Sequence, residues 1–335
     1  MKQERLNSII NAFTGKKVAV IGDLMIDVYL WGKATRISQE APVPVVNVQK
    51  KTHCLGGASN VMRNAATLGA SVMAFGVVGD DENGRIIRSM LDDYSIDAAN
   101  VLCDSTRRTT EKQRLIAGTQ QLVRIDYEET EAVSSGMRDR IVGNLLELIE
   151  KREIDAIIFE DYAKGMLDSE ILNQISAAAR KANIVVALDP HPNHPIKVSN
   201  LTLMTPNRME AFGLAGIYFR EEDSSVKNDV KLQEVALKIK EIWGPEYLLI
   251  TLGAQGMALF QKDGGFHSIP TRAREVFDVS GAGDTVISTF TLSLLGGAGP
   301  REAAEIANHA AGVVVGKVGT VTVTIDELFE SFGIA

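Results

Sequence analysis

The segment Asp278-Val-Ser-Gly-Ala-Gly-Asp284 carries the strongest chemical signal in the sequence, and it directly precedes an apolar stretch at 285–296. Small residues at a helix start let backbone N–H groups converge on an anion, where the helix dipole adds positive potential. Candidates for such an anion hole are Gly281, Ala282 and Gly283. Asp284 would lie beside the anion, and in phosphoryl transfer a carboxylate there orients and deprotonates an attacking hydroxyl. The alternative is a helix N-terminus with flexible glycines.

A second group of small and polar residues opens another helical stretch. Leu55-Gly-Gly-Ala-Ser-Asn60 contains Gly56 and Gly57, which let a ligand approach the backbone closely, and Asn60, which offers both a donor and an acceptor. Asp27 follows the first apolar strand, and with Asn60 it would form a pair suited to the hydroxyls of a polyol. The alternative interpretation is an aspartate in a turn and an asparagine in a helix.

Two further segments could hold a cation or a phosphate. In Thr205-Pro-Asn207-Arg-Met-Glu210, the spacing of Asn207 and Glu210 is that of a helix capping box, which is a structural explanation. The functional alternative is that both residues organise Mg²⁺, water and phosphate, because hard cations prefer oxygen ligands. In Glu160-Asp161-Tyr-Ala-Lys164-Gly165, which follows a strand, Lys164 would suit a phosphate group, because open α/β sheets bind ligands at this edge.

Basic residues and histidines supply weaker signals. The cations between 107 and 124 could hold a substrate phosphate or form a solvated surface: Arg107, Arg108, Lys112, Arg114 and Arg124. The histidines of Asp189-Pro-His191-Pro-Asn-His194 lie in a Pro-rich loop without a third soft ligand nearby in the sequence. This disfavours a transition-metal site.

Apolar runs and helical patterns alternate along most of the chain and predict the elements that would position these residues. The predicted strands are Lys17–Ile21, Val72–Val78, Asp155–Phe159, Ile184–Leu188, Leu201–Met204 and Tyr247–Thr251. Helices are predicted near 57–69, 82–94, 134–151, 168–182, 207–215, 229–243, 281–296, 301–316 and 325–332. Apolar strands separated by helices indicate an α/β fold with a mostly parallel sheet covered on both faces.

Two segments break this alternation. Residues 29–54 carry four valines around Pro42 and Pro44, and residues 107–126 alternate polar and apolar side chains. Both therefore predict antiparallel strands rather than crossover helices. A small sheet built from them could cover one end of the main sheet as a lid, and its exposed apolar face would favour a homodimer.

The composition limits the classes of function. The 335 residues are 45% hydrophobic and 23% charged with a formal net charge of −8, which predicts an ordered globular protein. This acidic balance disfavours general binding of nucleic acid or an anionic membrane. The N-terminus lacks an apolar signal core, and the longest uncharged run, 285–300, is too short to cross a membrane. Because Cys54 and Cys103 make no disulfide framework, we expect a cytoplasmic protein with reduced thiols.

Taken together, the motifs resemble those of the ribokinase-like, phosphofructokinase-B-type sugar kinases over nearly the whole chain. The resemblance rests on Gly56-Gly57 with Asn60, on Asn207 with Glu210, on Thr251-Leu-Gly253-Ala-Gln-Gly256 and, above all, on Gly281-Ala-Gly283-Asp284. It implies one kinase domain over 1–335, folded as a doubly wound three-layer α/β sandwich. The lid would be inserted at about 29–54 and 107–126.

The same resemblance implies a role for each site residue. Asp284 would be the catalytic base, and Gly281, Ala282 and Gly283 would hold the transferring phosphoryl group. Asn207 and Glu210 would support Mg²⁺, and a monovalent cation such as K⁺ could bind near Asp278. ATP would contact Asn207, Thr251, Gly253, Gly256 and Asn308. The acceptor sugar and its phosphate would contact Asp27, Gly56, Gly57, Asn60, Lys112, Arg124, Asp161 and Lys164.

A narrower similarity is to the kinase part of the heptose-7-phosphate kinase/adenylyltransferases. It is carried by Arg36–Val46, Gln121–Asp126, Asp161–Gly165 and Val313–Thr320. It implies phosphorylation of the anomeric hydroxyl of D-glycero-β-D-manno-heptose 7-phosphate, on the way to ADP-heptose for lipopolysaccharide. No nucleotidyltransferase domain follows in this sequence, so we expect that a separate protein would supply that activity.

The chain departs from this family at three positions. His191 stands where a lysine is usual, Ser280 where threonine is frequent, and Gln39 where proline is frequent. The missing lysine bears on the choice of sugar, since His191 or Lys197 could replace it. Two alternatives are another sugar or nucleoside kinase of the same family, and a sugar- or nucleotide-binding regulator without turnover. A nicotinamide dehydrogenase is disfavoured, because Val286 stands where the dinucleotide fingerprint needs its third glycine.

Overall fold

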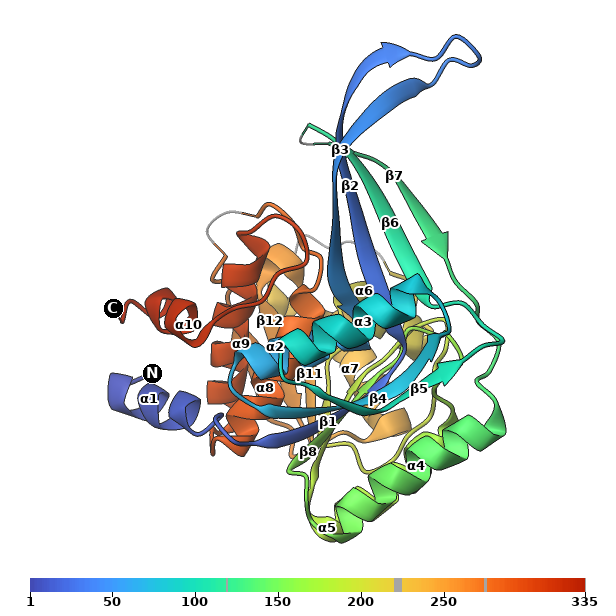
Figure 1. Cartoon of the computed structure of the whole chain (residues 1–335). Coiled ribbons are helices and arrows are strands. Elements are labelled where there is room, and N and C mark those ends of the chain that lie inside the picture. Colours follow the sequence, from blue (N-terminus) through green and yellow to red (C-terminus); the bar gives the residue numbers. More distant parts are fainter. Residues whose placement is uncertain (119, 220–224, 274–275, 335) are drawn as a thin grey trace.

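Two sheets organise the protein in the computed structural model, which describes residues 1–118, 120–219, 225–273 and 276–334 (Figure 1). Within these residues, the large sheet has the strand order β13-β12-β11-β10-β9-β8-β1-β4-β5 and the small sheet the order β3-β2-β6-β7. The predicted α/β class, with a mostly parallel large sheet and a second smaller one, is confirmed.

The large sheet forms the body of the molecule. Its strands are β1 Lys17–Gly22, β4 Ser71–Gly79, β5 Asp97–Asp104, β8 Ala156–Glu160, β9 Val185–Asp189, β10 Leu203–Met204, β11 Tyr247–Thr251, β12 Met257–Gln261 and β13 Phe266–Ile269. The strands from β11 to β5 pair in parallel, whereas β12 and β13 are antiparallel. The predicted strands include none of β5, β12 and β13. β5 is a partly exposed edge strand, so it shows no continuous apolar run.

Helices cover both faces of this sheet. They are α1 Gln3–Asn11, α2 Ala58–Thr67, α3 Glu82–Asp93, α4 Ser135–Glu150, α5 Ser169–Ala182, α6 Arg208–Ala215, α7 Val230–Trp243, α8 Ala282–Leu295, α9 Pro300–Val315 and α10 Ile325–Ser331, with 3-10 turns at Val226–Asn228 and Gly253–Gln255. Val18 and Val20 of β1 pack into one core with α2 and α8, whereas Ala19 and Ile21 pack into the other with α4, α5 and α7. In the described part of the chain, none of these helices combines the length and the apolar character needed to cross a bilayer.

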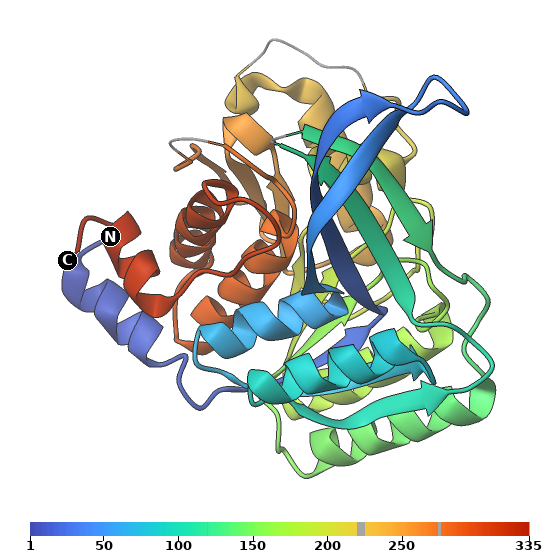
Figure 2. The ribbon, with the colours of Figure 1, turned by 45° about the horizontal axis from the view of Figure 1, so that its top comes forward.

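The small sheet, called the lid from here on, stands on one edge of the body (Figures 1 and 2). Its strands are β2 Leu24–Ile37, β3 Pro44–Gly57, β6 Thr110–Ala117 and β7 Gln120–Tyr127. Each excursion forms an antiparallel pair, and β2 and β6 join the two pairs in parallel. The first pair spans 24–57, which is longer than the predicted 29–54, because its lower part is buried against the body.

The chain order creates a topological switch point beside β1. From β1 the chain continues to β4 and β5 on one side, and it later adds β8, β9, β10 and β11 on the other. Open α/β sheets bind ligands at the carboxyl ends of their strands near such a point. Here Glu160 and Asp189 end β8 and β9, and α8 packs against both strands. The fold therefore gathers the candidate residues at this edge.

Candidate active site

Asp284 lies in the first turn of α8 and is 6% exposed. Side chains from two other elements hold its carboxylate: Asn60 Nδ2 donates to Oδ2 at 2.5 Å, and the Tyr162 hydroxyl donates to Oδ1 at 3.1 Å. Burial raises the pKa of Asp284, although both hydrogen bonds favour its charged form. An oriented carboxylate with a raised pKa can act as a general base.

Close packing explains the glycine at the start of α8. Gly281 has a φ of 77°, in the left-handed region, and a Cβ there would lie 2.7 Å from Nδ2 of Asn60. Glycine therefore allows the turn into the helix and the contact between Asn60 and Asp284. The amide of Ala282 already donates to the carbonyl of Val279 at 3.2 Å. The first-turn amides of Gly283 and Asp284 are the better candidates for binding an anion.

Carboxylates from three elements meet beside this helix start. Glu160, Asp189 and Asp284 each bring one oxygen within 4.8 Å of the others, and Glu160 and Asp189 are register partners. Desolvation and the neighbouring carboxylates raise the pKa of both Glu160 and Asp189. Among the described residues, Oε2 of Glu160 is buried without a hydrogen-bond partner. Clustered carboxylate oxygens are the ligands that hard divalent cations prefer, so these residues fit Mg²⁺.

Asn207 and Glu210 form the capping box that their spacing predicted. The amide of Glu210 donates to Oδ1 of Asn207 at 3.0 Å, and the amide of Asn207 donates to Oε2 of Glu210 at 2.7 Å. Desolvation raises the pKa of Glu210, and the charge of Asp284 adds to the rise. Because Glu210 in turn raises the pKa of Asp189, it belongs to the same acidic neighbourhood.

A cavity of about 850 Å³ opens in front of these groups. It is large enough for a nucleotide-sized ligand. All five residues assigned to ATP line it: Asn207, Thr251, Gly253, Gly256 and Asn308. Asp284, Glu210 and the residues 281–283 line it too, together with apolar side chains of α8 and α9 such as Val286 and Val315. Residues far apart in the sequence thus form one cavity with an apolar part and an acidic end.

The candidate acceptor residues lie on the lid side of Asp284. Asp27 of β2 is 6% exposed and accepts hydrogen bonds from Arg114 at 2.5 Å and from Thr320 Oγ1 at 3.4 Å. A Cβ on Gly56 would lie 2.9 Å from Oδ2 of Asp27, so this glycine makes room for the carboxylate. The charge of Asp27 also contributes to the raised pKa of Asp284.

Gly57 and Asn60 complete this corner of the site. Gly57 has a φ of 54° and caps α2, which begins at Ala58. Oδ1 of Asn60 accepts a hydrogen bond from Arg63 at 2.7 Å, while its Nδ2 faces Asp284. The side chain of Asn60 is therefore fixed from both ends, and its orientation is set by its two partners.

Lys112, Lys164 and Arg124 differ in how they are placed. Lys112 neighbours Asp27 in the register of β2 and β6, and its Nζ lies 5.6 Å from the centroid of the Tyr162 ring. Desolvation lowers the pKa of Lys112. Lys164 is paired with Glu128 at 2.9 Å, and the half-exposed Arg124 is paired with Asp126 at 2.9 Å. Of the three, Lys112 has no carboxylate within ion-pair distance in the described part of the chain.

The loop after β8 is held by a buried carboxylate. Asp23, 4% exposed, accepts the backbone N–H groups of Tyr162 and Lys164 at 3.0 Å and that of Met166 at 3.2 Å. Asp161 accepts a hydrogen bond from the amide of Ala163 and contacts the His194 ring at 3.0 Å. Burial raises the pKa of Asp161 to about 6. In this structure the carboxylate of Asp161 is therefore engaged by the amide of Ala163 and the ring of His194, which hold the loop.

His191 lies near this loop with a free ring nitrogen. Its Nδ1 is buried without a hydrogen-bond partner among the described residues. Burial lowers the pKa of His191, and the charges of Lys164 and Lys112 lower it further. The unpartnered imidazole nitrogen of His191 thus lies within electrostatic reach of Lys164 and Lys112.

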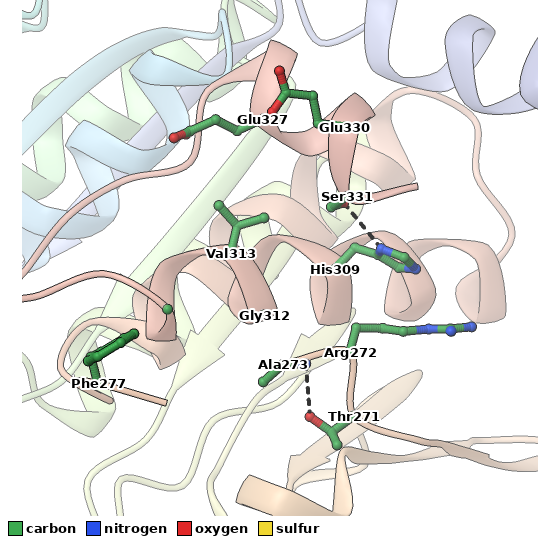
Figure 3. Close-up of a pocket in the computed structure, with 11 residues that line it drawn as sticks. Thr271, Arg272, Ala273, Phe277, His309, Gly312, Val313, Glu327, Glu330 and Ser331 are labelled. Atoms are coloured by element: carbon green, nitrogen blue, oxygen red, sulfur yellow. Dashed lines mark hydrogen bonds between the residues drawn. The ribbon is translucent and has the colours of Figure 1, made fainter. Parts of the chain in front are cut away.

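A second cavity, of about 780 Å³, is lined by the segment Thr271–Ala273 and by residues of α9 and α10 (Figure 3). Nδ1 of His309 lies 3.1 Å from Oγ of Ser331, and its ring stacks on Phe332 at a centroid distance of 3.6 Å. Burial lowers the pKa of His309 to about 4, which keeps the imidazole neutral. None of the carboxylates at the sheet edge lines this cavity, so we assign the chemistry to the first one.

Sequence reasoning missed three residues of the site. Glu160 and Asp189 appeared in quoted motifs without a role, and Tyr162 was not singled out at all. The available signal was that each acidic residue directly follows a predicted strand, and neighbouring parallel strands bring their carboxyl ends together. No comparable signal marks Tyr162, since only the fold of its loop directs it at Asp284.

Several known proteins are similar to this chain in sequence or in fold. The profile of the pfkB family carbohydrate kinases matches residues 15–327. The chain is 42% identical over 333 residues to the bifunctional protein HldE of Geobacter metallireducens, a match that covers 99% of this chain and 66% of that protein. The chain thus spans about two thirds of the length of this curated relative.

Solved structures show the same fold. Arabidopsis thaliana ribokinase complexed with ribose and ATP superposes with a TM-score of 0.73 at 18% identity, covering 96% of this chain and 100% of that one. Escherichia coli phosphofructokinase-2 in complex with potassium superposes with a TM-score of 0.77 at 19% identity, covering 96% and 99%. At such low identities, the likeness concerns the fold.

Proposed function

Because this chain belongs to the pfkB family of carbohydrate kinases, we propose that it transfers the γ-phosphoryl group of ATP to the anomeric hydroxyl of D-glycero-β-D-manno-heptose 7-phosphate. The observation that carries this proposal is the position of Asp284. Its carboxylate lies between a nucleotide-sized cavity and a polar corner formed by Asp27, Asn60 and Lys112. The narrower sequence similarity described above supports the choice of the heptose.

The proposed mechanism follows from the contacts of Asp284. The carboxylate would accept the proton of the anomeric hydroxyl while the hydroxyl oxygen attacks the γ-phosphorus, and ADP would leave on the opposite side. The amides of Gly283 and Asp284 would stabilise charge on the transferring group. Mg²⁺ held near Glu160, Asp189 and Glu210 would neutralise the phosphate oxygens. ATP would occupy the cavity from Asn207 to Asn308.

The acceptor side supports an anionic sugar. Lys112 is a partly buried ammonium without an ion-pair partner in the described part of the chain, and such a charge is stabilised when an anion binds. The free Nδ1 of His191 offers a further hydrogen bond near the same cations. We assign Lys112 and His191 to the distal phosphate, in place of the lysine that is usual at position 191 in related heptose kinases. Lys164 and Arg124 would need to leave Glu128 and Asp126 to take part.

Two further parts of the proposal concern a cation and a partner. Asp278 accepts the amides of Ser280 at 2.9 Å and Gly319 at 3.2 Å, so it joins the two loops beside which K⁺ would bind. All eight residues of β7 in the lid are exposed. Val123, Ile125 and Tyr127 are two residues apart, so their side chains lie on the same face of this strand. We propose that this apolar face pairs with the lid of a second copy.

Coupled ADP release with ATP and Mg²⁺ tests the reaction. Heptose 7-phosphate is offered beside fructose 6-phosphate, ribose and adenosine, with Asp284→Asn as the control. Turnover on the heptose phosphate that falls by about two to four orders of magnitude in the variant supports the proposal. Preferred turnover on another acceptor would replace the sugar and keep the mechanism. Absence of turnover on every acceptor would favour a regulator that binds without catalysis.

Lys112→Met separates the phosphate subsite from the rest of the site. We expect the KM for a phosphorylated acceptor to rise about tenfold or more, because a charge-assisted hydrogen bond is lost. The KM for ATP should change little. Lys33→Met, which removes an exposed lysine of the same lid sheet, is the matched control. Equal KM values for the two variants would remove Lys112 from the subsite.

A further inference from the structure

The Tyr162 hydroxyl occupies a hydrogen-bonding site on the carboxylate that would accept the proton of the attacking group. It donates to Oδ1 of Asp284 at 3.1 Å, while Oδ2 already accepts the bond from Asn60 at 2.5 Å. A general base must accept a hydrogen bond from the group that it deprotonates. A carboxylate oxygen can accept two hydrogen bonds, and the Tyr162 hydroxyl takes one of those on Oδ1, the oxygen that Asn60 does not hold.

The two bonds differ in how readily they can be exchanged. Asn60 is fully buried, held by Arg63 at its other end, and packed against Gly281. Tyr162 is only partly buried, belongs to a loop, and lines the cavity together with Asp284. The bond from Tyr162 is therefore the one that an incoming hydroxyl can replace.

The surroundings hold Tyr162 in this position. Asp23 accepts its backbone amide and two more amides of the same loop. Ala163 follows with a φ of 56°, in the left-handed region, which turns the chain sharply. Lys112 lies over the ring face at 5.6 Å, within the range of a cation–π interaction. A loop anchored in this way directs the hydroxyl at the base when no ligand is bound.

We propose that Tyr162 is a positioning residue that caps Asp284 and keeps the base from activating water until the acceptor hydroxyl displaces it. This inference rests on the proposed function, since it takes Asp284 as the base. Without the cap, a water oxygen would attack the γ-phosphorus and its proton would pass to Asp284. The bond from that phosphorus to ADP would break, giving ADP and inorganic phosphate. The cap thus favours transfer to sugar over hydrolysis of ATP.

Tyr162→Phe tests the cap, because it keeps the ring and removes the hydroxyl. Release of inorganic phosphate from ATP and Mg²⁺ is measured without sugar, and phosphorylation of sugar is measured separately. We expect the ratio of hydrolysis to transfer to rise about tenfold or more, which is the effect of losing one hydrogen bond to a charged group. Tyr247→Phe is the matched control, because Tyr247 is also partly buried and begins β11, at the end of that strand opposite to Thr251 in the cavity.

Three results would overturn the proposal. One is an unchanged ratio in Tyr162→Phe. A second is a parallel fall of both activities with a lower melting temperature, which indicates a structural role. The third is hydrolysis that persists in the double variant Tyr162→Phe/Asp284→Asn, because uncapped hydrolysis must pass through Asp284. A failure of the proposed function is distinct: wild-type protein would phosphorylate none of the sugars, while hydrolysis in Tyr162→Phe still reports on the cap.

Discussion

Gly281→Ala is the substitution that most directly tests how the base is held. The new Cβ would lie 2.7 Å from Nδ2 of Asn60, closer than side chains approach without displacement. Asn60 has no free direction of retreat, because Arg63 donates to its Oδ1 at 2.7 Å and its side chain is fully buried. The bond between Asn60 and Asp284 is therefore expected to break.

Two separate costs can be estimated for this variant. Alanine at a φ of 77° costs about 1–2 kcal/mol in stability, because its Cβ crowds the backbone in the left-handed region. Loss of a hydrogen bond to a charged group costs about 1.5–3 kcal/mol. If the loss of this hydrogen bond raises the activation free energy by the same ~1.5–3 kcal/mol, kcat falls about tenfold to hundredfold.

Gly297→Ala separates the two costs. Gly297 follows the other end of α8 with a φ of 83°, and a Cβ there would meet nothing within 4 Å. Both variants should lose similar stability from the backbone, measured by urea unfolding. Only Gly281→Ala should also lose kcat in the coupled assay of ADP release. Equal kcat values in the two variants would refute the role assigned to the contact between Asn60 and Asp284.

His309, Glu210 and Ile125 each provide a further test of the structure. The pKa of His309 is about 4 in the folded chain and 6.5 ordinarily, so the unfolded chain takes up the proton first as the pH falls. Between pH 6.5 and 4 the free energy of unfolding should therefore drop by about 3 kcal/mol. In urea titrations at pH 7 and 5, His309→Gln should lose less free energy of unfolding than wild type. An equal loss in the two proteins would contradict the role of His309. Glu210→Gln should raise the Mg²⁺ concentration for half-maximal activity about tenfold, with Glu234→Gln as the control, and unchanged half-saturation rejects a cation beside Glu210. Ile125→Lys should shift sedimentation from dimer to monomer while Leu237→Lys on α7 does not, and a wild-type monomer at every concentration removes the lid interface.

Local patterns in the sequence determined much of this protein. The apolar strands alternate with amphipathic helices, so the α/β class and most strand positions followed from periodicity. The small residues before Asp284 indicated an anion site at a helix start, because that geometry depends on consecutive residues alone. The capping box of Asn207 and Glu210 also followed from spacing within one helical turn.

Side-chain partners across elements could not be predicted in this way. Arg124 and Lys164 are ordinary cations in the sequence, and only the tertiary structure pairs them with Asp126 and Glu128. In the sequence, Lys112 looks like the same kind of ordinary cation. The register of β2 and β6 nevertheless places it beside Asp27 and over the ring of Tyr162. The availability of a charge is decided by its neighbours, and those are set by pairing between distant segments.

The three clustered carboxylates of Glu160, Asp189 and Asp284 show most clearly what the sequence determined and what the tertiary structure decided. The sequence by itself determined that Glu160, Asp189 and Asp284 follow or begin regular elements. Only the parallel register of β8 and β9, with α8 packed against their ends, brings the three carboxylates within 4.8 Å and desolvates them. The tertiary structure also decided which donors meet Asp284, because Asn60 and Tyr162 are 224 and 122 residues away along the chain. Residue types set which chemistry is available, whereas burial and distance set which groups perform it.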